Sequence, residues 1–348
     1  MRDIWSVYEK WNREGKPTTL ATVVSVTGSS LRPAGSKMLF NSASEIYGSV
    51  SGGCVEGAVF EEAGKVAADG NPRLVSYGVS NESAWEVGLS CGGSIKIFIE
   101  SMTSSAWNNV IQGVSNCITQ KKLGALVTIV SGPDTGEKAL LYSDGSYIKC
   151  DVSEDIILNI FSAIPGHWTV NDPISLTLQT NQGEVTVFVD FLVPPPRLII
   201  VGAVHIAIPL VTLAKTLDYY TIVVDPRSAF ATRERFPDAD ELIREWPEEA
   251  MGALKLDPSS CVICLSHDEK IDLPALKAAL YSPARYVGAL GSKVTQAKRL
   301  EALRDEGVDV EKLSLIRSPV GLKLGGKQPA EIALSILAEV VASQHGLA

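Results

Sequence analysis

The stretch PPPRLIIVG at residues 194–202 separates two parts of the chain and begins the second. Three consecutive prolines cannot continue a helix or a central strand, and they form a stiff, extended spacer. The apolar run at 198–201 ends in glycine and leads into a helical stretch, which is the order of a strand, a turn and a helix. The predicted organisation is one domain over residues 1–193, a proline linker over 194–197 and a second domain over 198–348.

Apolar strands and helices alternate through the second part. Further strands are expected at 221–224, 261–265 and 286–290, separated by helical segments of about 10–15 residues. A last helix begins at Pro329, where proline is well placed in a first turn. This alternation is typical of a parallel sheet covered by helices. The predicted fold class is therefore α/β, with a Rossmann-like C-terminal domain.

The first part shows short alternating strands at 20–26, 37–40 and 94–100, with a helix beginning after Cys54, and these predict an α+β domain. Three of its strands have similar partners later in the domain, at offsets of 106, 101 and 90 residues. Either the domain is an internal duplication whose second copy has lost the glycine-rich loops, or the likeness between short strands is due to chance. The matched pairs are TVVS (22–25) with TIVS (128–131), KMLF (37–40) with KALL (138–141), and IKIFIE (95–100) with VTVFVD (185–190).

Composition and charge exclude several kinds of partner. The chain of 348 residues carries a formal net charge of −9 with scattered basic residues, which disfavours nucleic acid and anionic lipid. Its longest apolar run, 198–214, falls short of the ~20 residues that a membrane-spanning helix needs, and residues 1–16 lack the apolar region of a signal peptide. We therefore expect a cytoplasmic protein whose six cysteines stay reduced.

Cys261 and Cys264 form a C-x-x-C pattern, but they lie in an apolar run that is predicted to be a strand. Residues three apart on a strand face opposite sides of the sheet, so the two sulfurs could not share a metal ion. The pattern therefore indicates two small core residues rather than a metal or redox site.

The loop GSSLRPAGSK at 28–37 combines small residues with two cations. Glycine and serine allow backbone amides to approach a ligand, Arg32 is suited to grip an anion with two hydrogen bonds, and Lys37 adds a point charge. The alternative is an ordinary solvated turn.

Two cysteines stand beside paired glycines in the same part of the chain. SGGCVE at 51–56 places Cys54 where a helix begins, and a cysteine at a helix N-terminus is expected to have a lowered pKa and more thiolate. SCGG at 90–93 places Cys91 just before a strand. Each cysteine could instead be a small residue that fits a tight turn.

Polar residues follow the four predicted strands of the second part. Because the carboxyl ends of parallel strands share one edge, these residues are expected to line a single crevice, with the two histidines either chemical or simply hydrogen-bonded at strand ends. Asp225 lies 23 residues after Gly202, near the position of a ribose-binding acid, but Val204 and Ala207 stand where dinucleotide-binding proteins have glycines. The prediction is a Rossmann shape without ordinary NAD binding. The crevice residues are Gly202, His205, Asp225, Arg227, His267, Asp268, Gly291, Ser292 and Lys293.

Together these motifs resemble the XdhC/CoxI family, the accessory proteins of xanthine dehydrogenase and carbon monoxide dehydrogenase. The likeness runs in order over nearly the whole chain, with residues 101–190 matched mainly by position. The motifs that carry it are GSSLRPAGSK (28–37), SGGCVEGAV (51–59) and CGGSIKIFIE (91–100) in the first part, and PPPRLIIVGAVH (194–205), VDPR (224–227), RERFPDAD (233–240), SHD (266–268), YVGALGSK (286–293) and SPVGLKLGGKQPAEIALSILAE (318–339) in the second.

The resemblance implies an accessory factor that binds molybdenum cofactor, promotes its sulfuration with a cysteine desulfurase and inserts it into an apo xanthine dehydrogenase-type hydroxylase. Such a factor has no enzymatic turnover of its own. Molybdopterin carries a phosphate and a dithiolene-bound metal, which match a cationic loop and a soft thiolate. A homodimer is expected, because a sheltered cleft favours the handover of a labile cofactor. The residues assigned to the cofactor are Arg32, Lys37, Cys54, Glu56 and Cys91, with Cys54 as a transient ligand of molybdenum.

Two other functions remain open. An NAD(P)-dependent oxidoreductase would use Arg227 beside Asp225 for a 2′-phosphate and His205 or His267 as an acid or base, although the missing glycines count against it. A non-catalytic subunit of the dehydrogenase complex would leave both sites vestigial. A fold alone does not decide among them.

Overall fold

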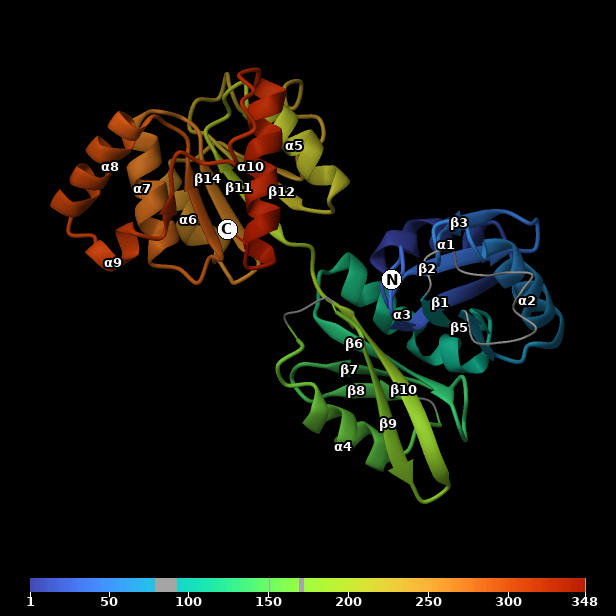
Figure 1. The fold of residues 1–348 in the computed structure, drawn as a ribbon. Coiled ribbons are helices and arrows are strands. Elements are labelled where there is room, and N and C mark those ends of the chain that lie inside the picture. The colour runs from blue at the N-terminus through green and yellow to red at the C-terminus, as the bar shows by residue number, and fades with distance from the viewer. Residues whose placement is uncertain (79–92, 150, 169–171, 348) are drawn as a thin grey trace. The chain divides into compact units, whose positions relative to one another are not determined.

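The computed structural model describes residues 1–78, 93–149, 151–168 and 172–347 (Figure 1). The chain forms two compact units, Met1–Pro194 and Pro195–Ala348, and the division falls within the proline run. Within the described ranges, no helix is both long and apolar enough to cross a membrane.

The first half of the N-terminal unit is a five-stranded antiparallel sheet in the order β3-β2-β1-β5-β4. Helix α2 packs on this sheet through Val59, Ala63 and Val66, which recur at helical spacing. The elements of this half are α1 (Arg2–Arg13), β1 (Thr18–Thr27), β2 (Lys37–Asn41), β3 (Ile46–Gly48), α2 (Glu56–Asp69), β4 (Arg73–Gly78) and β5 (Ser94–Ser101).

The second half of this unit is built on the same plan, with a five-stranded sheet in the order β8-β7-β6-β10-β9. Its two helices begin at serines whose hydroxyls accept a backbone hydrogen bond, Ser104 from Trp107 and Ser153 from Ile156. The elements are α3 (Ser105–Thr119), β6 (Gly124–Ser131), β7 (Lys138–Tyr142), β8 (Tyr147–Lys149), α4 (Glu154–Ala163), β9 (Ile174–Thr180) and β10 (Gly183–Leu192).

The two halves match in register as well as in strand order. Each central strand has one irregularity in its pairing, at Val24 in β1 and at Val130 in β6. This shared topology favours an internal duplication over chance likeness between short strands. In the first half Thr22 pairs with Lys37 and Phe98, and in the second half Thr128 pairs with Lys138 and Phe188.

The two sheets of the N-terminal unit meet through the faces that α2 and α4 do not cover. Alternate residues of β1 show this, because Ala21 and Val23 join the cluster under α2, whereas Leu20 and Val24 join clusters shared with the second half. Helices α1 and α3 contribute to one of these shared clusters. The other consists of Val24, Phe98, Val130 and Phe188, with Leu74 packed against it.

The C-terminal unit is a six-stranded parallel sheet in the order β13-β12-β11-β14-β15-β16, with helices on both faces (Figure 1). The predicted α/β class with a Rossmann-like domain is therefore confirmed. Helices α5 and α10 share the apolar cluster on one face, and α6, α7 and α8 contribute to the cluster on the other. The elements are β11 (Arg197–Val201), α5 (Ala207–Thr216), β12 (Tyr220–Val224), β13 (Glu241–Ile243), α6 (Pro247–Leu254), β14 (Ser260–Cys264), α7 (Glu269–Leu280), β15 (Tyr286–Ala289), α8 (Lys293–Asp305), α9 (Val310–Leu313), β16 (Ile316–Arg317) and α10 (Pro329–Gln344).

The two cysteines of the C-x-x-C pattern lie on β14, as predicted, and both are fully buried. Cys261 belongs to the cluster under α5 and α10, whereas Cys264 belongs to the cluster on the opposite face. Burial raises the pKa of Cys261 to about 12 and raises that of Cys264 as well. The prediction that these cysteines are small core residues on opposite faces of the sheet is confirmed.

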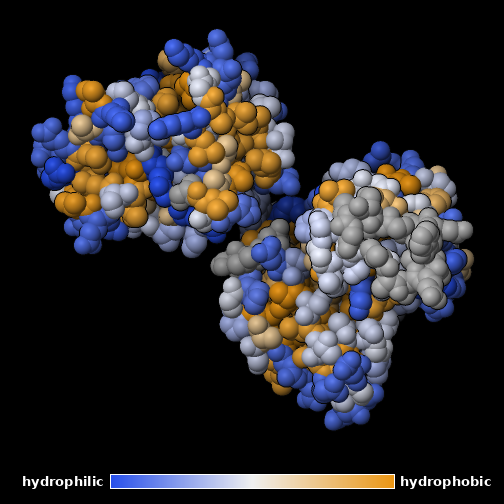
Figure 2. Space-filling view, in the orientation of Figure 1, coloured by the Kyte–Doolittle hydropathy of each residue, from blue (hydrophilic) through white to orange (hydrophobic). Residues whose placement is uncertain are grey.

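Apolar side chains also reach the surface of the C-terminal unit, over α10 and over α8 and α9 (Figure 2). Leu334 on α10, Val294 on α8 and Val310 on α9 are all exposed. Scattered apolar residues are normal on a globular protein and do not by themselves indicate a ligand or a partner.

Candidate functional site

The glycine-rich segments of the first half meet beyond the ends of its strands. Arg32 lies in the loop between β1 and β2, and its Nε donates a hydrogen bond of 3.2 Å to the carbonyl oxygen of Ser49, in the segment before α2. Gly52 has a φ of +80°, and a side chain there would meet Leu31 at 3.2 Å. A Cβ at Gly93, the last residue of the SCGG segment at 90–93, would overlap the carbonyl of Ser29. The first two predicted clusters and the end of the third are therefore neighbours.

Glu56 shapes the segment that carries Cys54. Its carboxylate accepts six hydrogen bonds, four of them from backbone amides at the start of α2. Burial opposes the charge, but the hydrogen bonds from the serines and the amides lower the pKa of Glu56 to about 2. The donors are Ser49 Oγ at 2.7 Å, Ser51 N at 2.9 Å, Ser51 Oγ, Gly52 N at 3.0 Å, Gly53 N at 2.9 Å and Val55 N at 3.2 Å.

This arrangement changes the expected roles of Glu56 and Cys54. The amides at the N-terminus of α2 make a natural anion site, and the carboxylate of Glu56 already fills it. Glu56 therefore holds the segment in shape. Cys54 lies one residue before the N-cap Val55, and it is partly buried against the cluster under α2. Its amide donates to Ser51 Oγ at 3.0 Å, so the thiol belongs to the segment that Arg32 contacts through Ser49.

Arg32 is the cation that the structure brings to this segment. Its side chain is half-buried, and its Nε is used by the Ser49 carbonyl. Among the described residues, its two terminal nitrogens have no hydrogen-bond acceptor. They are therefore the donors left for an anion such as a phosphate. Cys91 lies outside the described residues.

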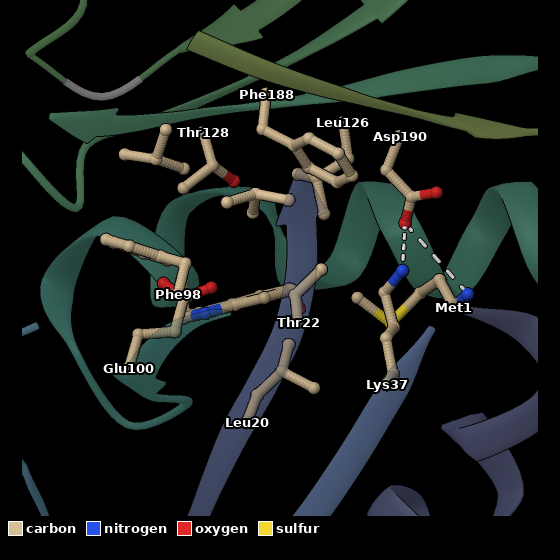
Figure 3. A pocket seen from close by; sticks show the side chains of 13 residues that line it. Met1, Leu20, Thr22, Lys37, Phe98, Glu100, Leu126, Thr128, Phe188 and Asp190 are labelled. Carbon is tan, nitrogen blue, oxygen red and sulfur yellow. Dashed lines mark ion pairs between the residues drawn. The ribbon is translucent and has the colours of Figure 1, made fainter. Parts of the chain in front are cut away.

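Lys37 does not join Arg32 at the surface. It is the first residue of β2 and is 2% exposed, and its Nζ lies 2.7 Å from Oδ2 of Asp190 on β10 (Figure 3). The same Nζ donates to the carbonyl of Gly35 at 2.8 Å. A second cation for a phosphate was expected here. The strand instead directs the ammonium into the interior, where a carboxylate neutralises it.

The interior that receives Lys37 holds a second ion pair, which sequence reasoning missed. Lys138 on β7 lies 2.8 Å from Oε2 of Glu100 on β5, and both side chains are buried. Lys37 holds the pKa of Asp190 below its usual range even though burial opposes the charge. The signal that could have revealed these acids is a single charge within an otherwise apolar strand, as in IFIES and VFVDF.

The residues around these pairs enclose a cavity of about 10 Å³, which has room for about one water molecule and none for an organic cofactor. Figure 3 shows Lys37, Asp190 and Thr128 turned toward this space from different strands. Asp190 also lies 3.9 Å from the amino group of Met1. The cavity is therefore part of the packing between the two halves.

The predicted residues of the C-terminal unit lie at one edge of its sheet, because β12, β11, β14 and β15 run parallel and end there. Gly202 has a φ of +102°, and a Cβ there would meet Ser266 N at 2.7 Å. This glycine is therefore needed for the close approach of the loop after β14. Val204 is partly buried and packs against the cluster under α5 and α10.

Asp225, the candidate ribose-binding acid, is fully buried and already paired. Its carboxylate accepts hydrogen bonds from Ala203 N at 2.7 Å and from Arg227 Nε at 2.9 Å and Nη2 at 2.7 Å. Burial would raise the pKa of Asp225, but these donors hold it below its usual value. Arg227 stacks 4.4 Å from the ring centre of Phe230. The carboxylate of Asp225 therefore makes its hydrogen bonds within the protein.

The other predicted residues of this edge are exposed or act as helix caps. His205 precedes α5, and His267 has a φ of 60°; both are exposed. Asp268 caps α7 by accepting from Lys270 N at 3.0 Å, and Ser292 caps α8 by accepting from Thr295 N at 3.1 Å, with Gly291 before that cap and Lys293 after it.

The same edge also holds a buried ion pair that was not predicted from the sequence. Asp272 Oδ2 lies 3.3 Å from Arg299 Nη2, and Asp272 Oδ1 accepts from Ser266 Oγ at 2.7 Å. Arg299 also donates to the carbonyl of Leu290 at 3.0 Å. The pair therefore ties the loop after β14 to the loop after β15. Its two members belong to helices that carry several other charged residues, so nothing in the sequence distinguished them.

Comparison with family models matches both units. The model of the XdhC Rossmann domain matches residues 198–340, and the model of the XdhC and CoxI family matches residues 11–78.

Individual relatives extend these matches over nearly the whole chain. A protein of Bacillus subtilis (strain 168) that is named as a probable xanthine dehydrogenase subunit is 29% identical over 338 residues, which cover 94% of each chain. The "Molybdenum cofactor insertion chaperone PaoD" of Escherichia coli (strain K12) is 28% identical over 327 residues, which cover 94% of this chain and 83% of that protein. A crystal structure described as a xanthine dehydrogenase from Bacillus halodurans superposes with a TM-score of 0.79 at 28% identity, covering 99% of this chain and 96% of the other.

Proposed function

Because the chain belongs to the XdhC and CoxI family, we propose that it binds molybdenum cofactor transiently and inserts it into a xanthine dehydrogenase-type hydroxylase. The Escherichia coli relative is named as a chaperone for this insertion, and the Bacillus subtilis relative is named as a probable subunit of xanthine dehydrogenase. The observation that carries the proposal is the meeting of Arg32 with the segment that holds Cys54. The cofactor is cargo, so the chain needs no turnover of its own.

The residues that meet there suit the chemistry of this cargo. Molybdopterin presents a phosphate, for which Arg32 has two nitrogens without an acceptor among the described residues. It also presents a soft metal–dithiolene centre, for which a cysteine sulfur is a suitable partner. Gly52 and Gly53 are exposed, so a ligand would meet little steric hindrance from this segment. Glu56 and Lys37 support the site from within and do not contact the cargo.

The finer steps of the proposal concern sulfuration and assembly. While the cofactor is held beside Cys54, a cysteine desulfurase would supply its terminal sulfur in the cytoplasm. Cys54 is either a transient ligand of molybdenum or a relay for that sulfur. A homodimer would shelter the cofactor until the apo-hydroxylase accepts it.

The proposal is tested by titrating the purified protein anaerobically with molybdenum cofactor. Arg32→Gln removes the cation and should weaken binding by about tenfold or more, because a hydrogen bond to a charged group contributes about 1.5–3 kcal/mol. Cys54→Ser removes the soft sulfur at nearly constant volume and should also weaken binding, because a hydroxyl oxygen is a poorer partner for a soft metal centre. Arg304→Gln, which removes an exposed arginine from the last turn of α8, is the matched charge control. Folded Cys54→Ser and Arg32→Gln variants that bind cofactor and activate the apo-hydroxylase as well as the wild type would contradict the proposal.

NAD(P) binding is a second candidate, favoured by the strand order of the C-terminal sheet, which is that of dinucleotide-binding folds. The buried and paired carboxylate of Asp225 and the approach of Ser266 to Gly202 count against it. A parallel titration with NADPH separates this function from the first. A purely structural subunit would bind neither ligand and would copurify with the dehydrogenase.

A further inference from the structure

We propose that Asp190, in the second half of the N-terminal unit, is a positioning residue for the Arg32 loop and acts through the buried ammonium of Lys37. The proposal gives the second half a function, although that half lacks the glycine-rich loops of the first. The effect on loop structure is independent of the proposed function, whereas the effect on cofactor binding rests on it.

Among the described residues, two buried lysine–carboxylate pairs cross between the halves, beside the longer contact of 3.9 Å between the Met1 amino group and Asp190. Lys37 of the first half pairs with Asp190 of the second at 2.7 Å, and Lys138 of the second pairs with Glu100 of the first at 2.8 Å. The lysines occupy equivalent register positions, opposite Thr22 in one sheet and opposite Thr128 in the other. The acids are equivalent too, since Glu100 lies opposite Leu20 and Asp190 opposite Leu126. The pairs are therefore related by an approximate twofold symmetry within one chain.

The loops next to the two lysines also contact the opposite half in equivalent ways. A Cβ at Gly35 would lie 2.9 Å from the ring of Pro173, and a Cβ at Gly136 would lie 3.0 Å from the ring of Pro72. Both glycines have positive φ values, +85° and +101°, which glycine adopts without a steric penalty. The end of each loop thus rests on a proline of the other half.

Only one of the lysines reaches back to its own loop. Lys37 Nζ donates to the carbonyl of Gly35 at 2.8 Å, three residues after Arg32. Lys138 Nζ donates instead to Thr128 Oγ1 at 2.9 Å, within its own sheet. The carboxylate of Asp190 therefore fixes the Lys37 ammonium, and the ammonium fixes the end of the loop that carries Arg32.

The equivalent loop of the second half is a matched control within the same chain. It reads GPDTGE at 132–137 and contains no arginine or lysine. Its amides have the same partners as those of the Arg32 loop: Gly35 N donates to Val23 O and Ser36 N to Pro33 O, while Gly136 N donates to Ile129 O and Glu137 N to Asp134 O. The four amides are thus equivalent reporters of the two loops.

The chain of contacts from Asp190 through Lys37 to the Gly35 carbonyl is called the tether below. Asp190→Asn tests the tether, and Glu100→Gln is its symmetry-related control. Each variant replaces one buried carboxylate by its amide and leaves a buried lysine without a counter-charge. In the ligand-free full-length protein, Asp190→Asn should speed hydrogen exchange at Gly35 and Ser36 by about tenfold while sparing Gly136 and Glu137. Glu100→Gln should leave Gly35 and Ser36 within about twofold of the wild type. Equal acceleration of both loops by Asp190→Asn, or none at all, overturns the proposal.

Two further variants keep the test decisive. Asp190→Glu retains the charge and should restore slow exchange at Gly35 and Ser36. If Asp190→Asn does not fold, the double variant Lys37→Met with Asp190→Leu removes both charges, a replacement that buried pairs often tolerate. It still deletes the bond to the Gly35 carbonyl, so exchange at Gly35 and Ser36 should again rise by about tenfold. A folded double variant with wild-type exchange in this loop also overturns the proposal.

Binding of molybdenum cofactor distinguishes this inference from the proposed function. Asp190→Asn should weaken binding by about tenfold, and Glu100→Gln by less than about twofold. If Asp190→Asn loosens the Arg32 loop but Arg32→Gln and Cys54→Ser bind cofactor as well as the wild type, the positioning role of Asp190 stands and the proposed cofactor site is wrong. If cofactor binding depends on Arg32 and Cys54 but hydrogen exchange at Gly35 and Ser36 is unchanged in Asp190→Asn, the proposed function stands and the tether is wrong.

Discussion

Replacing Glu56 by glutamine should loosen the start of α2 and destabilise the N-terminal unit. The carboxylate accepts hydrogen bonds from the amides of Ser51, Gly52, Gly53 and Val55 and from two serine hydroxyls. A glutamine side chain has only one acceptor oxygen, and its NH₂ group would lie against backbone amides that are themselves hydrogen-bond donors. The variant therefore removes the charge that the amides surround and part of the bonding as well.

The magnitude follows from the pKa of Glu56, which the structure lowers from 4.5 to about 2. That difference corresponds to about 3 kcal/mol, and solvent screening at this half-buried site reduces it to about 1–2 kcal/mol. The pKa is lower in the folded protein than in the unfolded chain, so the stabilisation is complete above about pH 4.5 and is lost as the pH falls toward about 2. The difference in stability between wild type and Glu56→Gln should fall by roughly half by pH 3.

Urea denaturation at pH 7, 4 and 3 measures this difference, and hydrogen exchange in α2 locates it. Glu61→Gln is the control, because Glu61 is exposed on the same helix. Its removal should change the free energy of unfolding by less than about 0.5 kcal/mol at any of these pH values. A Glu56→Gln variant as stable as the wild type at pH 7, or a deficit that stays constant down to pH 3, would refute the reasoning.

Two predictions concern the edge of the C-terminal sheet. Calorimetry with NAD and NADP should detect no micromolar binding to the wild type, nor to Val204→Gly, because Ser266 still approaches Gly202 in that variant; micromolar binding of either nucleotide would contradict this. Gly202→Ala should destabilise the protein by about 2–4 kcal/mol in urea denaturation, because of its φ of +102° and the contact with Ser266. Gly252→Ala, with open space around it, should be neutral or stabilising by up to about 1 kcal/mol. Equal effects of the two substitutions would show that Ser266 can move away from residue 202 at little cost in free energy.

The parallel sheet was predictable because its central strands are uninterrupted apolar runs. The runs at 198–201 and 221–224 coincide with the buried parts of β11 and β12. The edge strands were not predictable in this way. Glu241–Ile243 and Ile316–Arg317 are three and two residues long, and they count as strands only because a neighbouring strand pairs with them. So short a segment carries no periodicity of its own.

The internal duplication could be suspected from the sequence but not established. Its strands keep their register, whereas its loops differ in length, so the offset between equivalent strands drifts from 106 to 90 residues. Residues 79–93 separate β4 from β5, for example, whereas two residues join β9 to β10. A repeat without a fixed period is hard to distinguish from chance similarity, and the common strand order supplied the missing evidence.

At the candidate site, residue types in the sequence indicated segments that are neighbours in the structure, but they did not indicate the partners of the charged side chains. Arg32 and Lys37 are both cations of one loop, yet only Arg32 keeps donors for an anion among the described residues. The partner of Lys37 lies on β10 in the other half, so no local pattern could reveal it. The partners of Glu56 were not predictable either, because the amides that donate to its carboxylate belong to the backbone of its own turn, which residue types do not reveal.

The crossed ion pairs explain how two halves of common plan could diverge so unequally. Removing one member of a buried pair leaves an uncompensated charge and costs about 3–5 kcal/mol, so neither Lys37 nor Lys138 can change unless an acid in the other half changes with it. Apart from the glycines that pack on prolines of the other half, the exposed loops carry no such mutual constraint. One loop therefore has GSSLRPAGS and the other GPDTGE, while the lysine that follows each is the same. In our proposal, the half without a cationic loop keeps its buried acid and through that acid supports the Arg32 loop of the other half.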